Sequence, residues 1–420
     1  MSAAPISVER ARAAVLAGLG ALEPEQVPLA AALGRRLGAD AVAPAPVQAF
    51  DNSAMDGFAL RAADAACAAP GAPARLRLVG EACAGHPAPV AVGGGEAVAI
   101  STGAMLPEGA DAVARVEDTR REGEQVLVEA AARPGLNVRR AGEDFAAGET
   151  VLGAGTAIGA AELGVLASLS LDPVPCVRRP RVAVVTSGDE LTPLGEPLAP
   201  GAIRDSNGLA VPALAALAGA EVVSVGWAPD EPEATEAALA TALGSDLAVV
   251  CGGVSVGEHD HVKPALARLG VEQVFWRVAL RPGGPTWFGR LGPALVFGLP
   301  GNPVSALVTF LLFARPALLV LGGGDPAARR TRAVLAAPYA KPPGRAHAAR
   351  CRLELGAEGW LAHPFPRQGS HVLTSMVGAD CLALIPAESG DLEAGAEVEV
   401  ELLDGAGAAG PLAAGASLGG

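Results

Sequence analysis

The feature that most constrains the fold is a strand, a glycine-rich loop and a helix that follow one another without a break. Residues 246–250, Asp-Leu-Ala-Val-Val, are typical of a buried parallel strand. The loop that follows contains three glycines together with Ser255 and Asp260. Residues 262–269 then predict a helix that Gly270 closes. Parallel strands need such crossover helices, so this stretch predicts an α/β sheet.

The same loop is the first candidate binding site. Glycines let a ligand approach the backbone, and the start of the next helix offers free N–H groups to a phosphate or another anion. The alternative is an ordinary turn between strand and helix that happens to be rich in glycine. The presence of Ser255, Asp260 and Lys263 in one loop favours a site.

Strand and helix alternate on both sides of this stretch. Further strands are predicted at 181–186, 221–227, 274–280 and 294–297, and helices from after Gly208 to about Ala218 and from 303 onwards. This pattern predicts a doubly wound α/β domain, whose ligands bind at the carboxyl ends of its strands. Glu190, Asp205, Asp260 and the loop 298–303 follow such ends, so we expect them to face one crevice.

The rest of the chain consists mainly of short alternating segments. Those between 75 and 128 predict a small β domain, whose polar loops present Asp56 and Thr102 either to a ligand or as turn caps. Residues 331–403 return to β alternation. The predicted domains are a mixed N-terminal domain (1–46 and 137–177), the small β domain (47–136), the α/β domain (178–326), a C-terminal β domain (327–404) and a disordered tail (405–420).

Bulk properties exclude several classes of function. A chain of 420 residues needs more than one core, and its net charge of −14 argues against a nucleic-acid-binding surface. Six scattered cysteines without a Cys-x-x-Cys pair indicate reduced thiols, and the N-terminus shows no secretory signal. The apolar run 303–321 is interrupted by Arg315-Pro316, so we expect a buried helix and no membrane span. We therefore expect a cytoplasmic protein.

Seven motifs occur in one order along the chain. They are Asp51–Gly57, Thr102–Ala104 with Gly109–Val113, Gly142–Asp144, Ser187–Leu191, Asp205–Asn207, Gly252–Gly257 and Gly298–Ala306. In this order they resemble the molybdopterin molybdenumtransferase family, which includes bacterial MoeA and the E domains of gephyrin and its plant counterpart. The resemblance covers roughly residues 5–403. It implies an elongated four-domain homodimer with a molybdopterin-binding α/β domain.

The resemblance also implies a reaction. Adenylylated molybdopterin binds, molybdate is inserted into its dithiolene, and the pyrophosphate link is cleaved to release AMP with the help of Mg²⁺. Glu190 and Asp260 would hold the metal or act on the phosphoryl group, while Asp56 and Thr102 would act from the partner subunit. The implied substrate-binding positions are Asp205, Ser206, Asn207, Gly252, Gly253, Ser255, Arg281, Pro300, Pro303, Arg350 and Ser370. Molybdopterin adenylyltransferase and downstream molybdenum-cofactor proteins are candidate partners.

One position departs from the family pattern. The family commonly has a Lys-Pro-Gly-Lys-Pro run where this chain has Arg-Pro-Gly-Gly-Pro at 281–285. Arg281 keeps the first cation, although arginine and lysine are not equivalent, and Gly284 loses the second. We therefore expect a weaker affinity for the oxyanion, unless Arg204 restores the missing charge.

Two other functions are weighed against catalysis. A non-catalytic molybdopterin-binding or scaffold protein would keep the same fold, but the intact Asp56, Glu190 and Asp260 favour an enzyme. A nucleotide hydrolase unrelated to pterins would not need the small β domain or the C-terminal domain. His259 and His261 flank Asp260, but His-x-His alone is weak support for a metal site, so we expect structural or solvent-facing roles.

Overall fold

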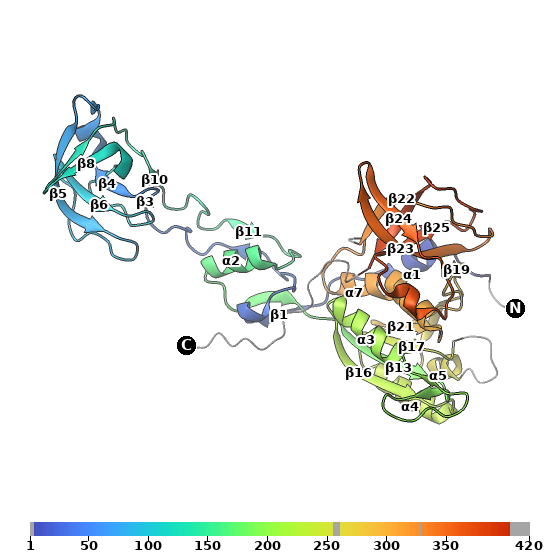
Figure 1. The fold of residues 1–420 in the computed structure, drawn as a ribbon. Coiled ribbons are helices and arrows are strands. Elements are labelled where there is room, and N and C mark those ends of the chain that lie inside the picture. The colour runs from blue at the N-terminus through green and yellow to red at the C-terminus, as the bar shows by residue number, and fades with distance from the viewer. Residues whose placement is uncertain (1–3, 255–260, 328, 404–420) are drawn as a thin grey trace. The chain divides into compact units, whose positions relative to one another are not determined.

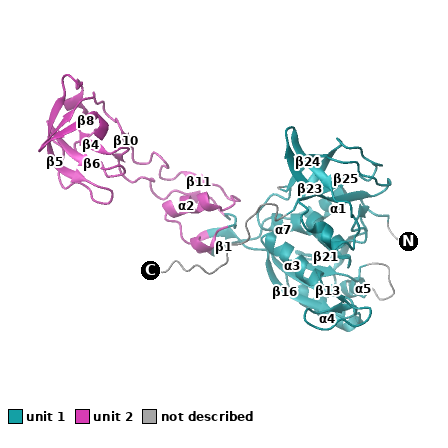
Figure 2. Cartoon of the chain, viewed as in Figure 1, with its two compact units in different colours: residues 1–26, 34–38, 175–420 teal, residues 27–33, 39–174 magenta. Residues whose placement is uncertain are grey.

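The structure is a computed structural model that describes residues 4–254, 261–327 and 329–403. Ser255 and Asp260 therefore lie outside the described residues. The chain divides into two compact units (Figure 2). Unit 1 comprises residues 1–26, 34–38 and 175–420, and unit 2 comprises residues 27–33 and 39–174. The finer division into four domains stays a prediction.

Unit 2 is built on a six-stranded sheet with the strand order β7-β4-β6-β5-β9-β8 (Figure 1). The strands are β4 (Gly57–Leu60), β5 (Ala74–Ala82), β6 (Glu96–Ile100), β7 (Ala112–Arg115), β8 (Thr119–Glu122) and β9 (Gln125–Val128). Phe58 and Leu60 belong to one core of this sheet and Ala59 to another, as expected for side chains that alternate along a strand. The alternating pattern at 75–128 thus corresponds to a sheet.

Shorter elements complete the N-terminal half of the chain. They are β1 (Pro24–Val27) paired with β12 (Val174–Val177), β2 (Ala41–Val42) with β11 (Thr150–Leu152), β3 (Asn52–Ser53) with β10 (Val138–Arg139), and helix α2 (Ala160–Ser168). Helix α2 begins after Gly159, whose N–H donates to the Glu162 carboxylate at 2.9 Å. Three short 3₁₀ turns lie at Leu29–Ala31, Ala62–Ala65 and Val116–Asp118.

Unit 1 contains the predicted α/β sheet, in the order β16-β13-β17-β21-β20-β18. The strands are β13 (Arg181–Ser187), β16 (Glu221–Ala228), β17 (Leu247–Cys251), β18 (Glu272–Trp276), β20 (Trp287–Leu291) and β21 (Ala294–Leu299). The first four in the sheet order are parallel, whereas β20 and β18 form antiparallel pairs at one side. The carboxyl ends of β16, β13, β17 and β21 consequently lie at one edge.

Helices cover both faces of this sheet. They are α1 (Val8–Leu16), α3 (Asn207–Leu217), α4 (Pro232–Ala242), α5 (Val262–Arg268), α6 (Pro303–Thr309) and α7 (Arg315–Leu321). Val182 and Val184 of β13 pack in one core with α1, α3, α6 and α7, while Ala183 and Val185 pack in the other with α4 and α5. Alternate residues of a strand thus reach opposite layers, which explains the continuous apolar strands in the sequence.

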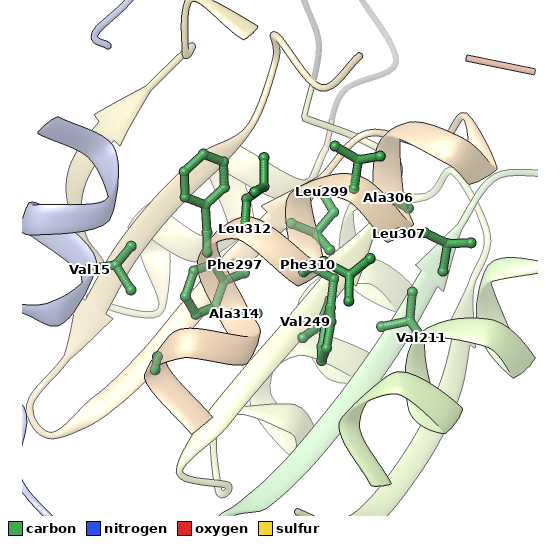
Figure 3. Packing of buried hydrophobic residues seen from close by; sticks show 14 of the residues in the cluster. Val15, Val211, Val249, Phe297, Leu299, Ala306, Leu307, Phe310, Leu312 and Ala314 are labelled. Carbon is green, nitrogen blue, oxygen red and sulfur yellow. The ribbon is translucent and has the colours of Figure 1, made fainter. Parts of the chain in front are cut away.

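The larger core surrounds the long apolar helix (Figure 3), in which a π-helical turn, Phe310–Ala314, joins α6 to α7. Phe297 and Phe310 are fully buried in this core, which also contains Val211 of α3. Residues 303–321 are long and apolar enough to cross a membrane, but 89% of this stretch is buried inside the protein. The burial confirms the predicted core helix.

The C-terminal sheet has the order β19-β23-β24-β22-β26-β25 and is closed by a further pairing between β23 and β25. Its strands are β19 (Leu280–Arg281), β22 (Arg330–Leu335), β23 (Ala346–Gly356), β24 (Gly359–Pro364), β25 (Cys381–Ile385) and β26 (Glu397–Leu402). Closure through β23 and β25 makes this β domain a small barrel. A 3₁₀ turn, Leu373–Met376, lies between β24 and β25.

The predicted strand at 274–280 is wrong in one respect. The structure ends β18 at Trp276, and Arg277 has a positive φ of 72°, which breaks the extended run. Leu280 and Arg281 then pair with Ala346 and His347 of the barrel. The short strand that carries Arg281 therefore belongs to the barrel and not to the α/β sheet.

A buried carboxylate, Glu401 of β26, ties the barrel to the helices of unit 1. Its Oε1 accepts from Arg315 Nη2 at 2.7 Å, and its Oε2 accepts from Arg330 Nε at 2.8 Å and from Arg12 Nη1 at 3.3 Å. The side chains of Glu401 and Arg315 are each 1% exposed. The network thereby connects α1, α7 and two strands of the barrel through one charge.

Candidate active site

The Asp205–Asn207 motif holds together two strand ends at the carboxyl edge of the α/β sheet. Asp205 accepts from Thr186 Oγ1 at 2.7 Å and from the N–H of Gly208 at 2.8 Å, so it fixes the start of α3 beside the end of β13. Asn207 Nδ2 donates to the carbonyl of Gly301 at 2.8 Å, which ties α3 to the loop after β21. Ser206 precedes the helix without capping it through its side chain.

The described part of the glycine loop is packed tightly at the end of β17. Gly252 and Gly253 both have positive φ angles, of 100° and 63°. A Cβ on Gly252 would lie 2.5 Å from the carbonyl oxygen of Ser187, and one on Gly253 would lie 2.4 Å from a methyl of Val262. Close packing therefore requires both glycines, in addition to any contact they make with a ligand. The predicted roles of Ser255 and Asp260 lie outside the described residues.

Glu190 lies at the end of β13, where the carboxyl edge is open to solvent. Its side chain folds back over Gly188, since a Cβ on that glycine would meet the carboxylate at 2.4 Å. The main-chain carbonyl of Glu190 accepts from Ile203 at 2.7 Å, which fixes this loop to the segment before α3. Within residues 4–254, 261–327 and 329–403, no group of three metal-ligating side chains is found.

A cavity of about 440 Å³, here called the basic cavity, opens beyond the end of β21. Its lining includes Arg281, Gly284, Pro300, Asn302, Ser305, Arg345, Ser370 and His371, without an acidic residue. The carbonyl of Ser370 accepts from Val304 at 3.2 Å, so the barrel loop is fixed at the start of α6. Three predicted substrate-binding residues, Arg281, Pro300 and Ser370, thus line one cavity. Pro303 is the first residue of α6 and is not among the lining residues.

A second cavity, of about 430 Å³, adjoins the first and shares Arg281 with it. This inner cavity is lined by Tyr339, His347 and the buried Arg350, whose Nε donates to Ser375 Oγ at 3.2 Å. Tyr339 Oη and His347 Nδ1 are hydrogen-bonded at 3.3 Å. Burial lowers the pKa of His347 to about 4, and so do the nearby cations Arg281, Lys341, Arg345 and Arg350. The imidazole is therefore neutral at pH 7 and reports a positive local potential.

Comparison with known proteins assigns most of the chain to one family. Residues 6–170 match the "MoeA N-terminal region (domain I and II)", residues 183–320 the "Probable molybdopterin binding domain", and residues 332–403 the "MoeA C-terminal region (domain IV)". The chain is 38% identical over 403 residues to molybdopterin molybdenumtransferase 2 of Mycobacterium tuberculosis, covering 94% of this chain and 98% of the relative. The chain belongs to the molybdopterin molybdenumtransferase family.

Other relatives agree with this assignment. The molybdopterin molybdenumtransferase of Haemophilus influenzae is 36% identical over 402 residues, which cover 94% of this chain and 98% of that protein. The gephyrin of Dictyostelium discoideum is 32% identical over 438 residues, covering 91% of this chain and 60% of gephyrin. The crystal structure of a molybdopterin biosynthesis MoeA protein from Pyrococcus horikoshii superposes with a TM-score of 0.83 at 34% identity, covering 95% of this chain and 99% of that one. The multidomain α/β and β architecture is thereby confirmed.

Two of the family motifs bring Asp56 and Thr102 together on unit 2. Asp56 Oδ1 accepts from the N–H of Thr102 at 2.8 Å, and both residues are exposed. The position after Asp56 requires a glycine, because a Cβ on Gly57 would lie 2.0 Å from the carbonyl oxygen of Ala114. Asp51 accepts from the N–H of Ala141, and this bond is the main cause of its lowered pKa. The motifs therefore place Asp56 and Thr102 next to each other at the surface of unit 2.

Sequence reasoning missed several residues of the two cavities. Tyr339, His347 and Arg345 stand alone in the sequence, without a motif or a spacing that would single them out. Arg204, the predicted replacement for the missing lysine, instead donates to the carbonyl of Pro193 at 2.6 Å. Arg345 is the second arginine among the described residues that line the basic cavity.

Proposed function

We propose that this transferase inserts molybdate into adenylylated molybdopterin and releases AMP, which gives the molybdenum cofactor. The observation that carries the proposal is the basic cavity at the carboxyl edge of the α/β sheet, where Arg281, Arg345 and Ser370 meet. Arginine provides charge-assisted donors in a fixed geometry, which suits an oxyanion such as molybdate or a phosphate. The names of the relatives supply the reaction class.

In this mechanism the residues of the carboxyl edge hold the substrates in place. Arg281 and Ser370 bind molybdate, while Asp205 and Asn207 keep the strand ends of β13 and β21 at a fixed spacing. Fixed donors contribute to catalysis because they need no reorganisation when charge develops. His347 is neutral at pH 7, so it adds no further positive charge beside Arg281 and Arg350.

Mg²⁺ fits the exposed carboxylate of Glu190, with Asp260 as the second proposed ligand. Mg²⁺ takes only one or two carboxylates in phosphoryl-transfer sites, and substrate phosphates complete its coordination. Glu190 is exposed at the end of β13, where the phosphates of a ligand on the strand edge would pass. When bound, the ion would lower the cost of the charge that develops on the phosphate oxygens.

The proposal also includes a homodimer. Asp56 and Thr102 lie together on unit 2, and they would complete the site of the partner subunit. The protein would work in the cytoplasm, receive its substrate from molybdopterin adenylyltransferase and pass the finished cofactor to downstream enzymes. Neither a nucleic acid nor a membrane is part of the proposal.

The test is to incubate the purified protein with adenylylated molybdopterin, Mg²⁺ and molybdate. We expect the release of AMP together with the formation of active cofactor, and loss of turnover in Glu190→Gln with substrate binding retained. Tight binding of molybdopterin by the wild-type protein without turnover would support a scaffold instead. Unchanged turnover of Glu190→Gln at limiting Mg²⁺ would remove Glu190 from the metal site.

A further inference from the structure

A further cavity of about 190 Å³, here called the arginine cavity, lies at the amino-terminal edge of the α/β sheet. Its lining includes Pro180, which directly precedes β13, and Gly219, which lies shortly before β16. The basic cavity lies at the opposite edge, as does an apolar cavity of about 340 Å³ that is lined by Trp227 and Leu209 beside β16. Strand β13 has seven residues with a rise of about 3.3 Å each, so roughly 20 Å separates the two edges.

Arginine side chains dominate the lining of this cavity. Six of them line it, all from unit 1: Arg35, Arg36, Arg178, Arg179, Arg315 and Arg329. No acidic residue occurs among the described residues of the lining. The chain as a whole has a net charge of −14, so this concentration of positive charge does not follow from its composition. Like charges repel one another, so a cavity of this kind attracts anions.

Two of these guanidinium groups are held in place by the protein. Arg178 Nη1 and Nη2 donate to the Asp246 carboxylate at 2.8 Å and 2.9 Å. Arg35 Nη2 donates to the carbonyl of Val177 at 2.9 Å and also pairs with Glu25. A guanidinium has five N–H donors, so each of these side chains has donors beyond those in its ion pair. Donors that are already ordered bind an anion with a smaller loss of conformational entropy.

Arg179 differs from these neighbours, because it is exposed and forms no ion pair with another described residue. The carboxyl ends of two helices are the alternative explanation for the arginines, since the last turns of α3 and α7 line the cavity at Leu217 and Leu319. Each helix end carries about half a negative charge, so the two together offset about one of the six arginines. Helix capping therefore does not explain the whole set.

The geometry of arginine and the size of the cavity select the ligand. The guanidinium fork binds phosphate oxygens through paired N–H donors. Guanidinium groups from several segments offer donors to more oxygens than the two of a carboxylate. Sites for drug-sized ligands usually measure about 300–1,000 Å³, so a cavity of about 190 Å³ has room for one or two phosphate groups and excludes a whole nucleotide.

We propose that the arginine cavity binds a small anion with one or two phosphate groups, at the edge of the sheet opposite the transferase site. This inference does not depend on the proposed function. Arg315 lines the cavity and also donates to Glu401 of the barrel, so a bound anion would lie beside the charge network that joins α7 to the barrel. Binding of the anion should therefore raise the thermal stability of unit 1.

The test measures the binding of inorganic pyrophosphate to the full-length protein by calorimetry, without Mg²⁺. Arg281→Ala is the common background, because the basic cavity also attracts anions. In this background Arg179→Gln should weaken pyrophosphate binding about tenfold, since it removes hydrogen bonds to a charged group. Arg179→Lys keeps the charge but loses the fork, so its affinity should be intermediate. Arg352→Gln, an exposed arginine of β23, is the matched control and should not change the affinity.

Four outcomes would overturn the assignment. Equal pyrophosphate affinity with and without Arg179→Gln would remove the anion from this cavity. Equal affinity for malonate, a dicarboxylate of similar length, would make the site specific for carboxylates. A change in oligomeric state of Arg179→Gln by light scattering, without pyrophosphate binding in the background protein, would make the arginines a contact between subunits. Arg179→Gln alone should keep wild-type turnover, and a loss of turnover as large as that in Arg281→Ala would place Arg179 in the transferase reaction.

Discussion

The basic cavity beyond β21 and the apolar cavity beside β16 lie at one edge of the same sheet but differ in what they can recognise. The basic cavity is lined by Arg281 and Arg345, and the barrel supplies part of its lining. The second is lined by Trp227 and Leu209 and belongs to the α/β domain alone. The basic cavity therefore offers positive charge to a ligand, whereas the apolar cavity offers a largely apolar surface.

The largest expected effect is on the buried network around Glu401, which joins the barrel to the helices of unit 1. Glu401→Gln leaves Arg12, Arg315 and Arg330 around a buried neutral group, so we expect a loss of about 3–5 kcal/mol in the free energy of unfolding. Chemical denaturation measures this loss. Glu399→Gln, on the same strand but with an exposed side chain, is the control and should cost less than about 1 kcal/mol. Equal losses in the two variants would show that the buried network is not what joins the barrel to the helices.

The next effect concerns the basic cavity. Arg281→Ala removes a cation from this cavity, so we expect turnover to fall about 100-fold, in the range seen when one stabilising donor is deleted. Arg352→Ala, an exposed arginine on β23, serves as the control and should leave turnover unchanged. Unchanged turnover in Arg281→Ala would remove Arg281 from the proposed oxyanion site.

A smaller effect concerns pH at the inner cavity. His347 has a folded pKa of about 4, below the ordinary value of 6.5, so the unfolded chain binds more protons between these values. Its contribution to stability is therefore complete above pH 6.5 and is lost as the pH falls towards 4. At pH 5 the loss relative to pH 7 should be about 2 kcal/mol. Denaturation of His347→Gln should lack this component, whereas His363→Gln, a more exposed histidine of β24, should keep it.

The smallest expected effect is a gain. A Cβ on Gly284 would meet only the carbonyl oxygens of Leu280 at 3.4 Å and Val278 at 3.7 Å, so a side chain is accommodated there. Gly284→Lys adds a cation to the basic cavity and should lower the molybdate concentration for half-maximal insertion a few-fold. Gly284→Gln has a long side chain without the charge and should not reproduce the gain. If Lys leaves the requirement for molybdate unchanged or raises it, Gly284 is not a missing contact.

The sequence predicts the α/β sheet well because its strands are apolar on both faces and follow one another closely along the chain. The prediction from sequence fails at β19. Arg281 pairs there with His347, and a strand partner so far along the chain leaves no local pattern in the sequence. Motifs locate Asp205 and Asn207, whose polar groups serve local contacts. Trp227 and Arg345 are single residues in unremarkable segments, so only the fold brings them to a cavity.

The hydrogen bonds between β19 and β23 give the basic cavity a further property. Because Arg281 belongs to the barrel's sheet while Pro300 and Asn302 follow β21, the lining of the cavity comes from both the barrel and the α/β sheet. An anion that contacts both sides needs them packed together, so its binding free energy adds to the stability of unit 1. A substitution that loosens the packing of the barrel should therefore also weaken the affinity for the oxyanion.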